Sequence, residues 1–239
     1  MPRPPRRRRV SRAVRPPRFG AFSRTVRPAL RLIDAVHRDG NLPTIAVRPL
    51  ADPPGGDTQG QYWPGIGETV PVIELWRGCG FPWVVCIHEI GHFLDDRGFA
   101  LPADQWASEA SPLLQQWRDV VSQTRVCARL RSLRSLPQYR VTDANGQSRL
   151  VCFEEVILGN GTIVERPVDV DLVRYAGAWR ELFARSYVQY IVRESGDARL
   201  MEQFMQVRVG ESVVLHWDED DFLPVHAAID DLMRLVGWR

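Results

Sequence analysis

With 239 residues, of which 44% are hydrophobic, the chain is long enough to bury one sizeable core, and one domain with appendages is the simplest expectation. Its apolar runs stay well short of the ~18–20 residues that cross a bilayer, and its amino terminus lacks the apolar segment of a secretory signal. We therefore expect a cytoplasmic protein that makes no membrane contact. Without a secretion signal, Cys79, Cys86, Cys127 and Cys152 fit a reducing compartment and a packing role better than a disulfide framework.

The net charge of +2 hides a strong asymmetry along the chain. Eleven of the 31 basic residues, all arginines, lie in residues 1–31, and the first acidic residue is Asp34. The remaining 20 basic against 29 acidic residues give residues 32–239 a net charge of −9. We expect residues 1–27 to form a disordered arm, because the arginine- and proline-rich residues 1–18 offer too little apolar surface to pack. This arm is either a solvated tail or, through residues 1–18, a contact for nucleic acid or another acidic surface.

The elements that follow the arm alternate between helix and strand. Residues 28–38 predict a helix that begins at Pro28, and residues 44–47 predict a short strand. The proline- and glycine-rich residues 52–61 predict a loop. Residues 70–76 predict a strand, which is either an interior strand or an edge strand that pairs with an extended peptide.

Residues 82–97 predict a helix that carries His88-Glu89-Ile90-Gly91-His92 and ends at Gly98. On a helix, His88 and His92 lie one turn apart on one face, so both imidazoles can reach one tetrahedral metal ion. Glu89 lies on the neighbouring flank, where a carboxylate can accept a proton from a water molecule whose pKa a zinc ion lowers to about 7. This spacing is typical of zinc-dependent peptidases. The alternative is a helix with two ordinary histidines at its rim.

The second half of the chain is predicted to be mostly helical, with one β-rich insertion. Residues 103–133 predict an interrupted helical stretch that breaks at Pro112. Residues 137–168 predict a β-hairpin insertion, because Asn-Gly pairs at 145–146 and 160–161 each separate two strand-like runs. We further expect helices over 171–193, 199–207 and 224–236 and a strand over 212–217. His216 and His226 are expected at the surface or rim.

A catalytic zinc site needs a third protein ligand. One class of zinc peptidases takes it from a Gly-x-x-His or Gly-x-x-Asp extension, which requires glycine at position 95, where this chain has Asp95. Another class uses a glutamate on a later helix, and Glu181 is the best-placed candidate. The alternative for Glu181 is a solvated charge on a helix.

Two segments resemble the gluzincin catalytic domain of anthrax lethal factor and of related zinc peptidases encoded beside bacteriophage head genes. They are residues 88–96, His-Glu-Ile-Gly-His-Phe-Leu-Asp-Asp, and residues 175–187, which contain Tyr175 and Glu-Leu-Phe-Ala-Arg-Ser-Tyr. The resemblance implies that Glu181 is the third zinc ligand, that Tyr175 stabilises the oxyanion of the transition state, and that the protein is associated with phage. Tyr175 stands one residue closer to Glu181 than is usual there, and Arg185 replaces a common acid. Otherwise Tyr175 is a core aromatic residue.

Together these observations predict an α+β, zincin-like fold over residues 28–239, with a small sheet packed on the motif helix. We expect one Zn²⁺ per chain, held by His88, His92 and Glu181, in an endopeptidase that uses Glu89 as general base and Tyr175 as oxyanion donor on a peptide or protein substrate. Two alternatives remain: a catalytically silent, zinc-stabilised structural or assembly component, and a nucleic-acid-binding protein that acts through its basic arm.

Overall fold

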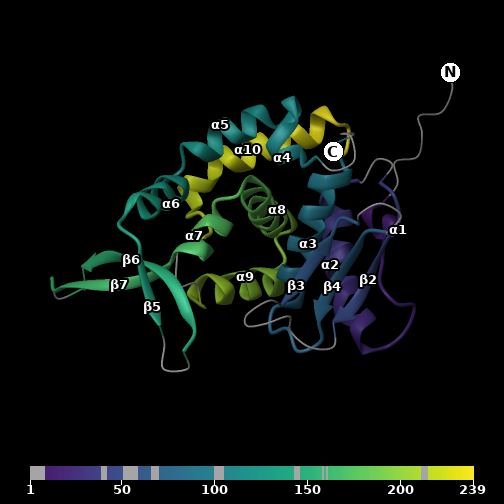
Figure 1. The fold of residues 1–239 in the computed structure, drawn as a ribbon. Helices are drawn as coiled ribbons and strands as arrows, with labels where there is room; N and C mark the ends of the chain where they lie inside the picture. The colour runs from purple at the N-terminus through teal and green to yellow at the C-terminus, as the bar shows by residue number, and fades with distance from the viewer. Residues whose placement is uncertain are drawn as a thin grey trace, which may run out of the picture.

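The computed structural model describes residues 9–38, 42–50, 59–65, 70–99, 105–142, 146–157, 159, 161–210 and 215–239. Over these residues the protein is a mixed α+β structure rich in helices, with two small sheets, as the sequence predicted. The two sheets lie on opposite sides of a helical layer that contains α8 (Trp179–Ser195) (Figure 1). None of the described helices combines the length and apolar character needed to cross a membrane.

The first sheet has four strands in the order β1-β2-β4-β3. Strands β1 (Val14–Arg15), β2 (Ile45–Leu50) and β4 (Val72–Trp76) are parallel, and β3 (Gly60–Trp63) pairs antiparallel with β4. Alternate side chains of β2 and β4 are buried, so one face of the sheet packs on the core. The buried side chains are Ile45 and Val47 of β2 and Ile73 and Leu75 of β4. The two predicted strands are therefore confirmed. The predicted loop over 52–61 is wrong at its end, because β3 begins at Gly60; residues 51–58 lie outside the described part.

The amino-terminal region differs from the prediction. Helix α1 (Val10–Ala13), β1 and α2 (Ala21–Val36) are ordered elements, so the prediction of a disordered arm is wrong from residue 10 onward. Apolar residues stand between the arginines in the sequence, and their side chains pack into the core. Those that are fully buried are Val10, Val14, Val26, Ala29 and Ile33. Pro28 lies inside α2 instead of beginning it, so the expected domain boundary after residue 27 falls within a helix. Residues 1–8 lie outside the described part.

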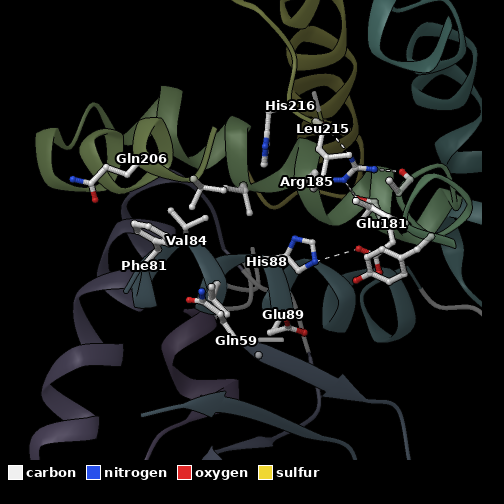
Figure 2. Close-up of a pocket in the computed structure, with 17 residues that line it drawn as sticks. Gln59, Phe81, Val84, His88, Glu89, Glu181, Arg185, Gln206, Leu215 and His216 are labelled. Atoms are coloured by element: carbon white, nitrogen blue, oxygen red, sulfur yellow. Dashed lines mark hydrogen bonds and ion pairs between the residues drawn. The ribbon is translucent and has the colours of Figure 1, made fainter. Parts of the chain in front are cut away.

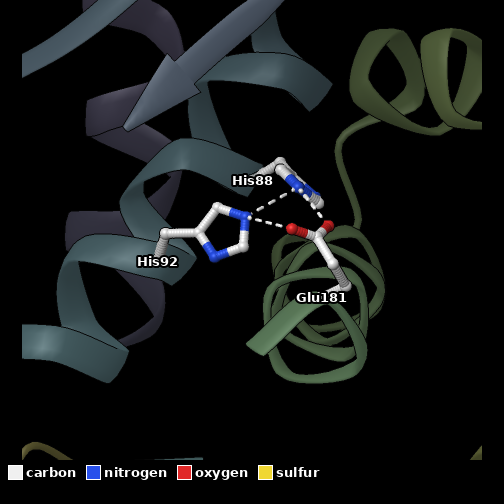
Figure 3. Close-up of side chains that lie close together, drawn as sticks. All are labelled: His88, His92 and Glu181. Atoms are coloured by element: carbon white, nitrogen blue, oxygen red, sulfur yellow. Dashed lines mark hydrogen bonds and ion pairs between the residues drawn. The ribbon is translucent and has the colours of Figure 1, made fainter. Parts of the chain in front are cut away.

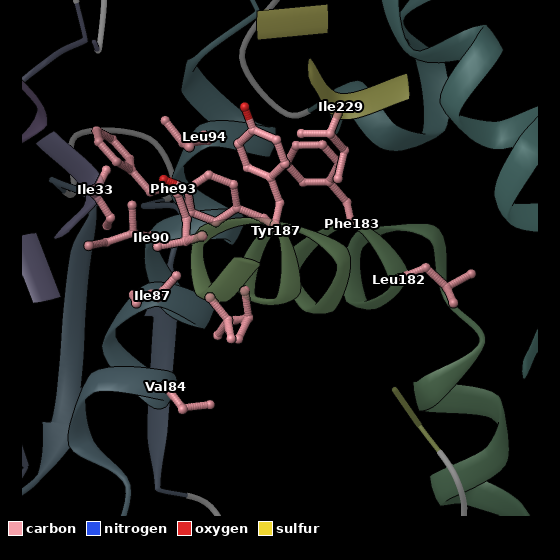
Figure 4. Close-up of a cluster of buried hydrophobic side chains, with 14 of the residues drawn as sticks. Ile33, Val84, Ile87, Ile90, Phe93, Leu94, Leu182, Phe183, Tyr187 and Ile229 are labelled. Atoms are coloured by element: carbon pink, nitrogen blue, oxygen red, sulfur yellow. The ribbon is translucent and has the colours of Figure 1, made fainter. Parts of the chain in front are cut away.

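Helix α3 (Pro82–Arg97) has the predicted bounds, with Pro82 in its first turn. Gly98 follows it and donates its N–H to the carbonyl of Leu94 at 2.7 Å. The helix is buried nearly all round, because it packs against α2, α8, β3 and β4. Figure 4 shows its apolar side chains interleaved with those of α8, among them Ile90, Phe93 and Tyr187. This core holds the two helices of the candidate site together.

The predicted interruption of the following helical stretch is confirmed. The elements are α4 (Ala107–Ala110), a 3-10 turn (Pro112–Leu114), α5 (Gln115–Ser122) and α6 (Arg125–Ser135). The predicted β insertion is also confirmed: β5 (Tyr139–Thr142), β6 (Ser148–Ile157) and β7 (Ile163–Asp169) form an antiparallel sheet in that order. Gly146 and Gly161 adopt φ angles of 78° and 83°, as expected for Asn-Gly hairpin turns.

The helix predicted over 171–193 is two helices, α7 (Val170–Ala176) and α8. Helix α7 ends at Ala176: the N–H of Gly177 closes its last turn on the carbonyl of Val173, and Ala178 is extended. The guanidinium of Arg134 donates to the carbonyls of Val173 and Arg174 in this last turn. Helices α9 (Ala198–Gly210) and α10 (Glu219–Leu235) complete the chain, and α10 begins five residues earlier than predicted. The strand predicted over 212–217 is not seen at residues 215–217, and residues 211–214 lie outside the described part.

The four cysteines are free thiols. Cys86, Cys127 and Cys152 are buried, whereas Cys79 is partly exposed and donates from its sulfur to Oε1 of Gln59 at 2.9 Å. The predicted packing role therefore holds for the three buried cysteines.

Candidate metal centre

The two motif histidines face each other one turn apart on α3. Their Nε2 atoms are 3.1 Å apart, and their rings stand almost perpendicular, at 87°. His92 is buried, while the side chain of His88 keeps 20% of its surface exposed. The indole ring of Trp106 packs edge-on against His92, which covers that side of the pair.

Glu181 enters from the first turn of α8 and completes a three-residue cluster (Figure 3). Its Oε2 atom lies 3.4 Å from Nε2 of His88, and its Oε1 atom lies 3.2 Å from Nε2 of His92. Glu181 is 4% exposed, so the alternative of a solvated helix charge is wrong. The fold thus brings together residues that are 89 positions apart in the sequence.

The cluster fits a tetrahedral metal ion. A zinc ion with bonds of about 2.0–2.1 Å separates its ligand atoms by about 3.3 Å in tetrahedral geometry. The two Nε2 atoms are 3.1 Å apart, close to that spacing, and the carboxylate of Glu181 reaches each histidine with a different oxygen, at 3.4 Å and 3.2 Å. One ligand atom from each residue lies within 4.8 Å of the other two. Two imidazole nitrogens and one carboxylate oxygen are also a donor set that suits zinc and leaves a fourth position for water or substrate.

A close approach of α3 and α8 sets these distances. Gly91 lies between the two histidines, and a Cβ atom at this position would lie 2.9 Å from Cα and 3.3 Å from Cβ of Ala184. Ala184 follows Glu181 by three residues, on the same side of α8. The pair of small residues therefore allows the backbones to touch where Glu181 must reach the histidines.

The charges of the cluster stabilise one another. Burial alone would raise the pKa of Glu181, but hydrogen bonds and positive charge from His88 and His92 outweigh burial and hold this pKa well below its usual value. Burial lowers the pKa of His88, yet the hydrogen bond and charge of Glu181 dominate and raise it. Both shifts show that the cluster favours a positive charge beside the carboxylate, which a bound cation would supply.

Glu89 belongs to the same site without joining the cluster. Its carboxylate is buried, which raises its pKa, while the positive charge of His88 and His92 lowers it. Strand β3 holds Glu89 from the other side: the backbone of Tyr62 hydrogen-bonds to the carboxylate, and a Cβ on Gly60 would lie 3.1 Å from its Oε1 atom. Glu89 is therefore a positioned carboxylate that faces the metal centre.

Tyr175 lies at the end of α7, before the break that precedes α8. The residue is 54% exposed, so the alternative of a core aromatic residue is wrong. Its hydroxyl hydrogen-bonds to Glu181, and partial burial of the side chain together with the charge of Glu181 raises the pKa of Tyr175 above its usual value. A phenol with a raised pKa keeps its proton and remains a hydrogen-bond donor.

The site opens into a cavity of about 590 Å³ whose walls are mostly apolar. His88, Glu89, Tyr175 and Glu181 line one part of it, and α9 and the residues before α10 form the opposite wall. In Figure 2, Gln206 and His216 lie across the cavity from Glu89. The apolar side chains that line it are Phe81, Val84, Val85, Leu172, Ala176, Val188, Val207 and Leu215.

Two residues of this region have a position or a role that the sequence did not indicate. His216 is buried and lines the cavity, whereas we expected it at the surface or rim. Arg185 donates to the backbone carbonyls of Ala176, Glu181 and Leu215, so it ties α7, α8 and the segment before α10 together. The only sequence signal for Arg185 is its spacing of four residues from Glu181. His226 is partly buried and lies 2.8 Å from Glu194, away from the cluster.

The edge strand beside the site is β3, not the strand over residues 70–76 that the sequence suggested as one possibility. Strand β4 lies between β2 and β3, so it is an interior strand. Strand β3 is at the edge and contacts α3. The phenol of Tyr62 donates to the carboxylate of Asp96, and Arg97 donates to Asp96 at 2.9 Å and to the carbonyl of Pro64 at 2.8 Å. These contacts fasten the edge strand to the helix that carries the histidines.

Comparisons of the chain with family models, with curated proteins and with solved structures found no match. Four features of the site bear on its chemistry: the cluster of two histidines and a glutamate, a separate buried carboxylate, a phenol and an adjoining apolar cavity.

Proposed function

We propose that the protein is a zinc-dependent endopeptidase with one Zn²⁺ per chain, built on a zincin-like fold similar to that of the gluzincins. The observation that carries this proposal is the position of Glu89. It is buried beside His88 and His92 and fixed by β3, yet it is not one of the three clustered ligands. Burying a carboxylate costs free energy, and a purely structural metal site has no use for it.

The residues divide the steps of peptide hydrolysis among them. Zinc held by His88, His92 and Glu181 would supply a Lewis acid for the scissile carbonyl and for a water molecule. Glu89 accepts the proton of the attacking water, for which its raised pKa makes it a better base, and passes this proton to the leaving amine. Tyr175 keeps its proton and donates a hydrogen bond to the oxygen on which negative charge develops.

The surroundings suit an extended peptide. The outer edge of β3 pairs with no other strand in the described part of the chain, so its backbone can hydrogen-bond a peptide that runs past Glu89. The cavity of about 590 Å³ accommodates an apolar side chain next to the scissile bond. Backbone pairing and one apolar pocket together support an endopeptidase.

The test compares Glu89→Gln with Glu155→Gln. Glutamine keeps the size and polarity of Glu89 but cannot accept a proton, so peptide cleavage should fall by about 10²–10⁴-fold. Zinc content, measured by elemental analysis, should remain near one per chain. Glu155 is exposed on β6, so its variant should cleave as the wild type does.

A broad peptide library serves as substrate, and a zinc chelator gives the background. Equal cleavage by the wild type and Glu89→Gln would remove Glu89 from the mechanism. A zinc-loaded wild type that cleaves nothing in the library would favour the structural or assembly role.

A further inference from the structure

Six arginines near the amino terminus are exposed on ordered elements. Arg12, Arg15 and Arg18 lie on or next to α1 and β1, and Arg24, Arg27 and Arg31 lie on α2. We call these six residues the arginine face. At 3.6 residues per turn, the three arginines of α2 fall within an arc of about 60° on its outer surface.

Two hydrogen bonds place the preceding segment beside that arc. The backbone N–H of Ser11 donates to Oδ1 of Asp34 at 3.2 Å, and the guanidinium of Arg27 donates to the carbonyl of Arg18 at 3.3 Å. Asp34 and Arg27 are seven residues apart, so they lie on nearly the same side of α2. Residues 11–18 therefore run antiparallel along the flank of α2, which places the backbone of the exposed Arg12, Arg15 and Arg18 beside that helix.

The arginine face differs from the other arginines of the protein in its pairing. Within the described residues, none of its six members forms an ion pair with an acidic side chain, although nine other arginines do. The guanidinium of Arg27 bonds only neutral acceptors, the hydroxyl of Ser23 and the carbonyl of Arg18. Arg9, just before α1, is exposed as well, and the sequence has four further arginines at positions 3, 6, 7 and 8, outside the described part. No acidic side chain in the described part of the chain pairs with the arginine face, so its positive charge is available to a partner.

We propose that the arginine face binds the phosphodiester backbone of a nucleic acid. Guanidinium groups recognise phosphate with paired, charge-assisted hydrogen bonds, and all basic side chains here are arginines. Arg24 to Arg31 span about 10.5 Å of helix, which corresponds to about three phosphate steps of one strand at 3.4 Å each. Phe19, which is 78% exposed beside Arg18, offers a ring on which an unpaired base stacks.

A membrane surface fits the arginine face less well. Basic amphipathic helices bind lipid by inserting their apolar face below the headgroups. The apolar face of α2 is already buried in the protein core, through Val26, Ala29, Leu30 and Ile33. The exposed surface of α2 and the preceding segment is therefore charged, and Phe19 is its one large exposed apolar side chain in the described part of the chain.

The test measures binding of the full chain to a fluorescein-labelled DNA oligonucleotide, single-stranded and as a duplex, by fluorescence anisotropy. The variant is Arg24→Gln/Arg27→Gln/Arg31→Gln, whose three side chains are exposed. Between about 50 and 200 mM salt, the slope of log K against log salt should become shallower by about 2–3, because each phosphate contact contributes about 0.9 for a duplex and 0.7 for a single strand. Affinity at the higher salt should fall at least about tenfold.

The matched control is Arg131→Gln/Arg140→Gln/Arg149→Gln, which removes the same charge from exposed positions on α6 and the β insertion. It should bind as the wild type does. A wild type that binds neither oligonucleotide, or equal losses in the two triple variants, would overturn the proposal. So would binding to phosphatidylserine vesicles without binding to DNA. Stronger binding of the single strand or of the duplex identifies the form of nucleic acid.

Discussion

Gly91 and Ala184 mark the point of closest approach between α3 and α8: a Cβ atom on Gly91 would lie 2.9 Å from the Cα of Ala184. The same two helices carry His92 and Glu181, one residue after Gly91 and three residues before Ala184. The small pair of Gly91 and Ala184 therefore sets how closely His88, His92 and Glu181 approach one another, although neither small residue belongs to the cluster.

Replacing Gly91 with alanine should weaken zinc binding. The added methyl group has to push the backbone of Ala184 away, and overpacking of this kind costs about 1–3 kcal/mol of stability. Because Glu181 moves with α8, we also expect a zinc affinity at least about tenfold lower, measured by competition with a chromophoric chelator. Gly80→Ala is the control, since nothing lies within 4 Å of a Cβ at Gly80. Unchanged zinc affinity in Gly91→Ala would show that helix separation does not govern the site.

Glu181→Ala should abolish stoichiometric zinc binding. The variant removes one of three ligands and leaves His88 without the carboxylate that raises its pKa. Glu155→Ala is a better control than Glu154→Ala. The carboxylate of Glu154 pairs with Arg129 and Arg166, so its loss would disturb the β insertion. The measurement is the zinc content of both variants after dialysis, determined by elemental analysis. Full occupancy in Glu181→Ala would contradict the proposed ligand set.

Tyr175→Phe should slow catalysis without loss of zinc. Removing one oxyanion donor typically lowers kcat by about 10²–10³-fold. Because Tyr175 is about half exposed, loss of its hydroxyl should leave the melting temperature nearly unchanged. Tyr139→Phe, at an exposed position on β5, is the matched control. A variant with normal kcat and raised KM would instead assign Tyr175 to substrate binding.

His37 should make the protein lose stability in acid. It lies buried between α2 and α8, with Nε2 2.7 Å from the hydroxyl of Tyr187, and burial lowers its pKa from 6.5 to about 4. Because the unfolded chain binds the proton more tightly, the stabilisation is present above pH 6.5 and is lost as the pH falls toward 4. The loss amounts to about 3 kcal/mol over this range.

The measurement is the free energy of unfolding in urea across this pH range, for the wild type and for His37→Asn. The difference in unfolding free energy between the two proteins isolates the contribution of His37. Other groups titrate equally in both, among them Asp95, because burial raises the pKa of Asp95 to about 7. The difference should shrink as the pH falls from 6.5 to 4. A constant difference would show that His37 does not titrate with folding.

Sequence reasoning was most successful where neighbouring residues decide the structure. The bounds of α3 follow from Pro82 and Gly98, and the facing of His88 and His92 follows from a spacing of four on a helix. The hairpins of the β insertion follow from Asn-Gly pairs that need positive φ angles. In each case the signal lies within a few residues of the structure that it specifies.

Two predictions were wrong for a different reason: the disordered arm at the amino terminus and the single helix over residues 171–193. The composition of residues 9–27 is that of a disordered segment, but a few apolar side chains, such as Val10 and Val14, fill places in a core formed by later residues. Similarly, the apolar stripe over residues 172–190 continues across Gly177, although α7 ends there and Arg134, from α6, donates to the carbonyls of its last turn. Burial against distant segments overrides local composition and periodicity.

The sequence by itself determined the helix with its two histidines and the presence of a glutamate on a later helix. Only the tertiary structure decided that Glu181 lies 3.2 Å from His92, that β3 rather than β4 is the edge strand beside Glu89, and that the arginines form one ordered face. The physical reason is that hydrogen-bond spacing within an element is encoded by adjacent residues. Distances between elements depend on packing contacts such as Gly91 with Ala184, which join residues that are 93 positions apart.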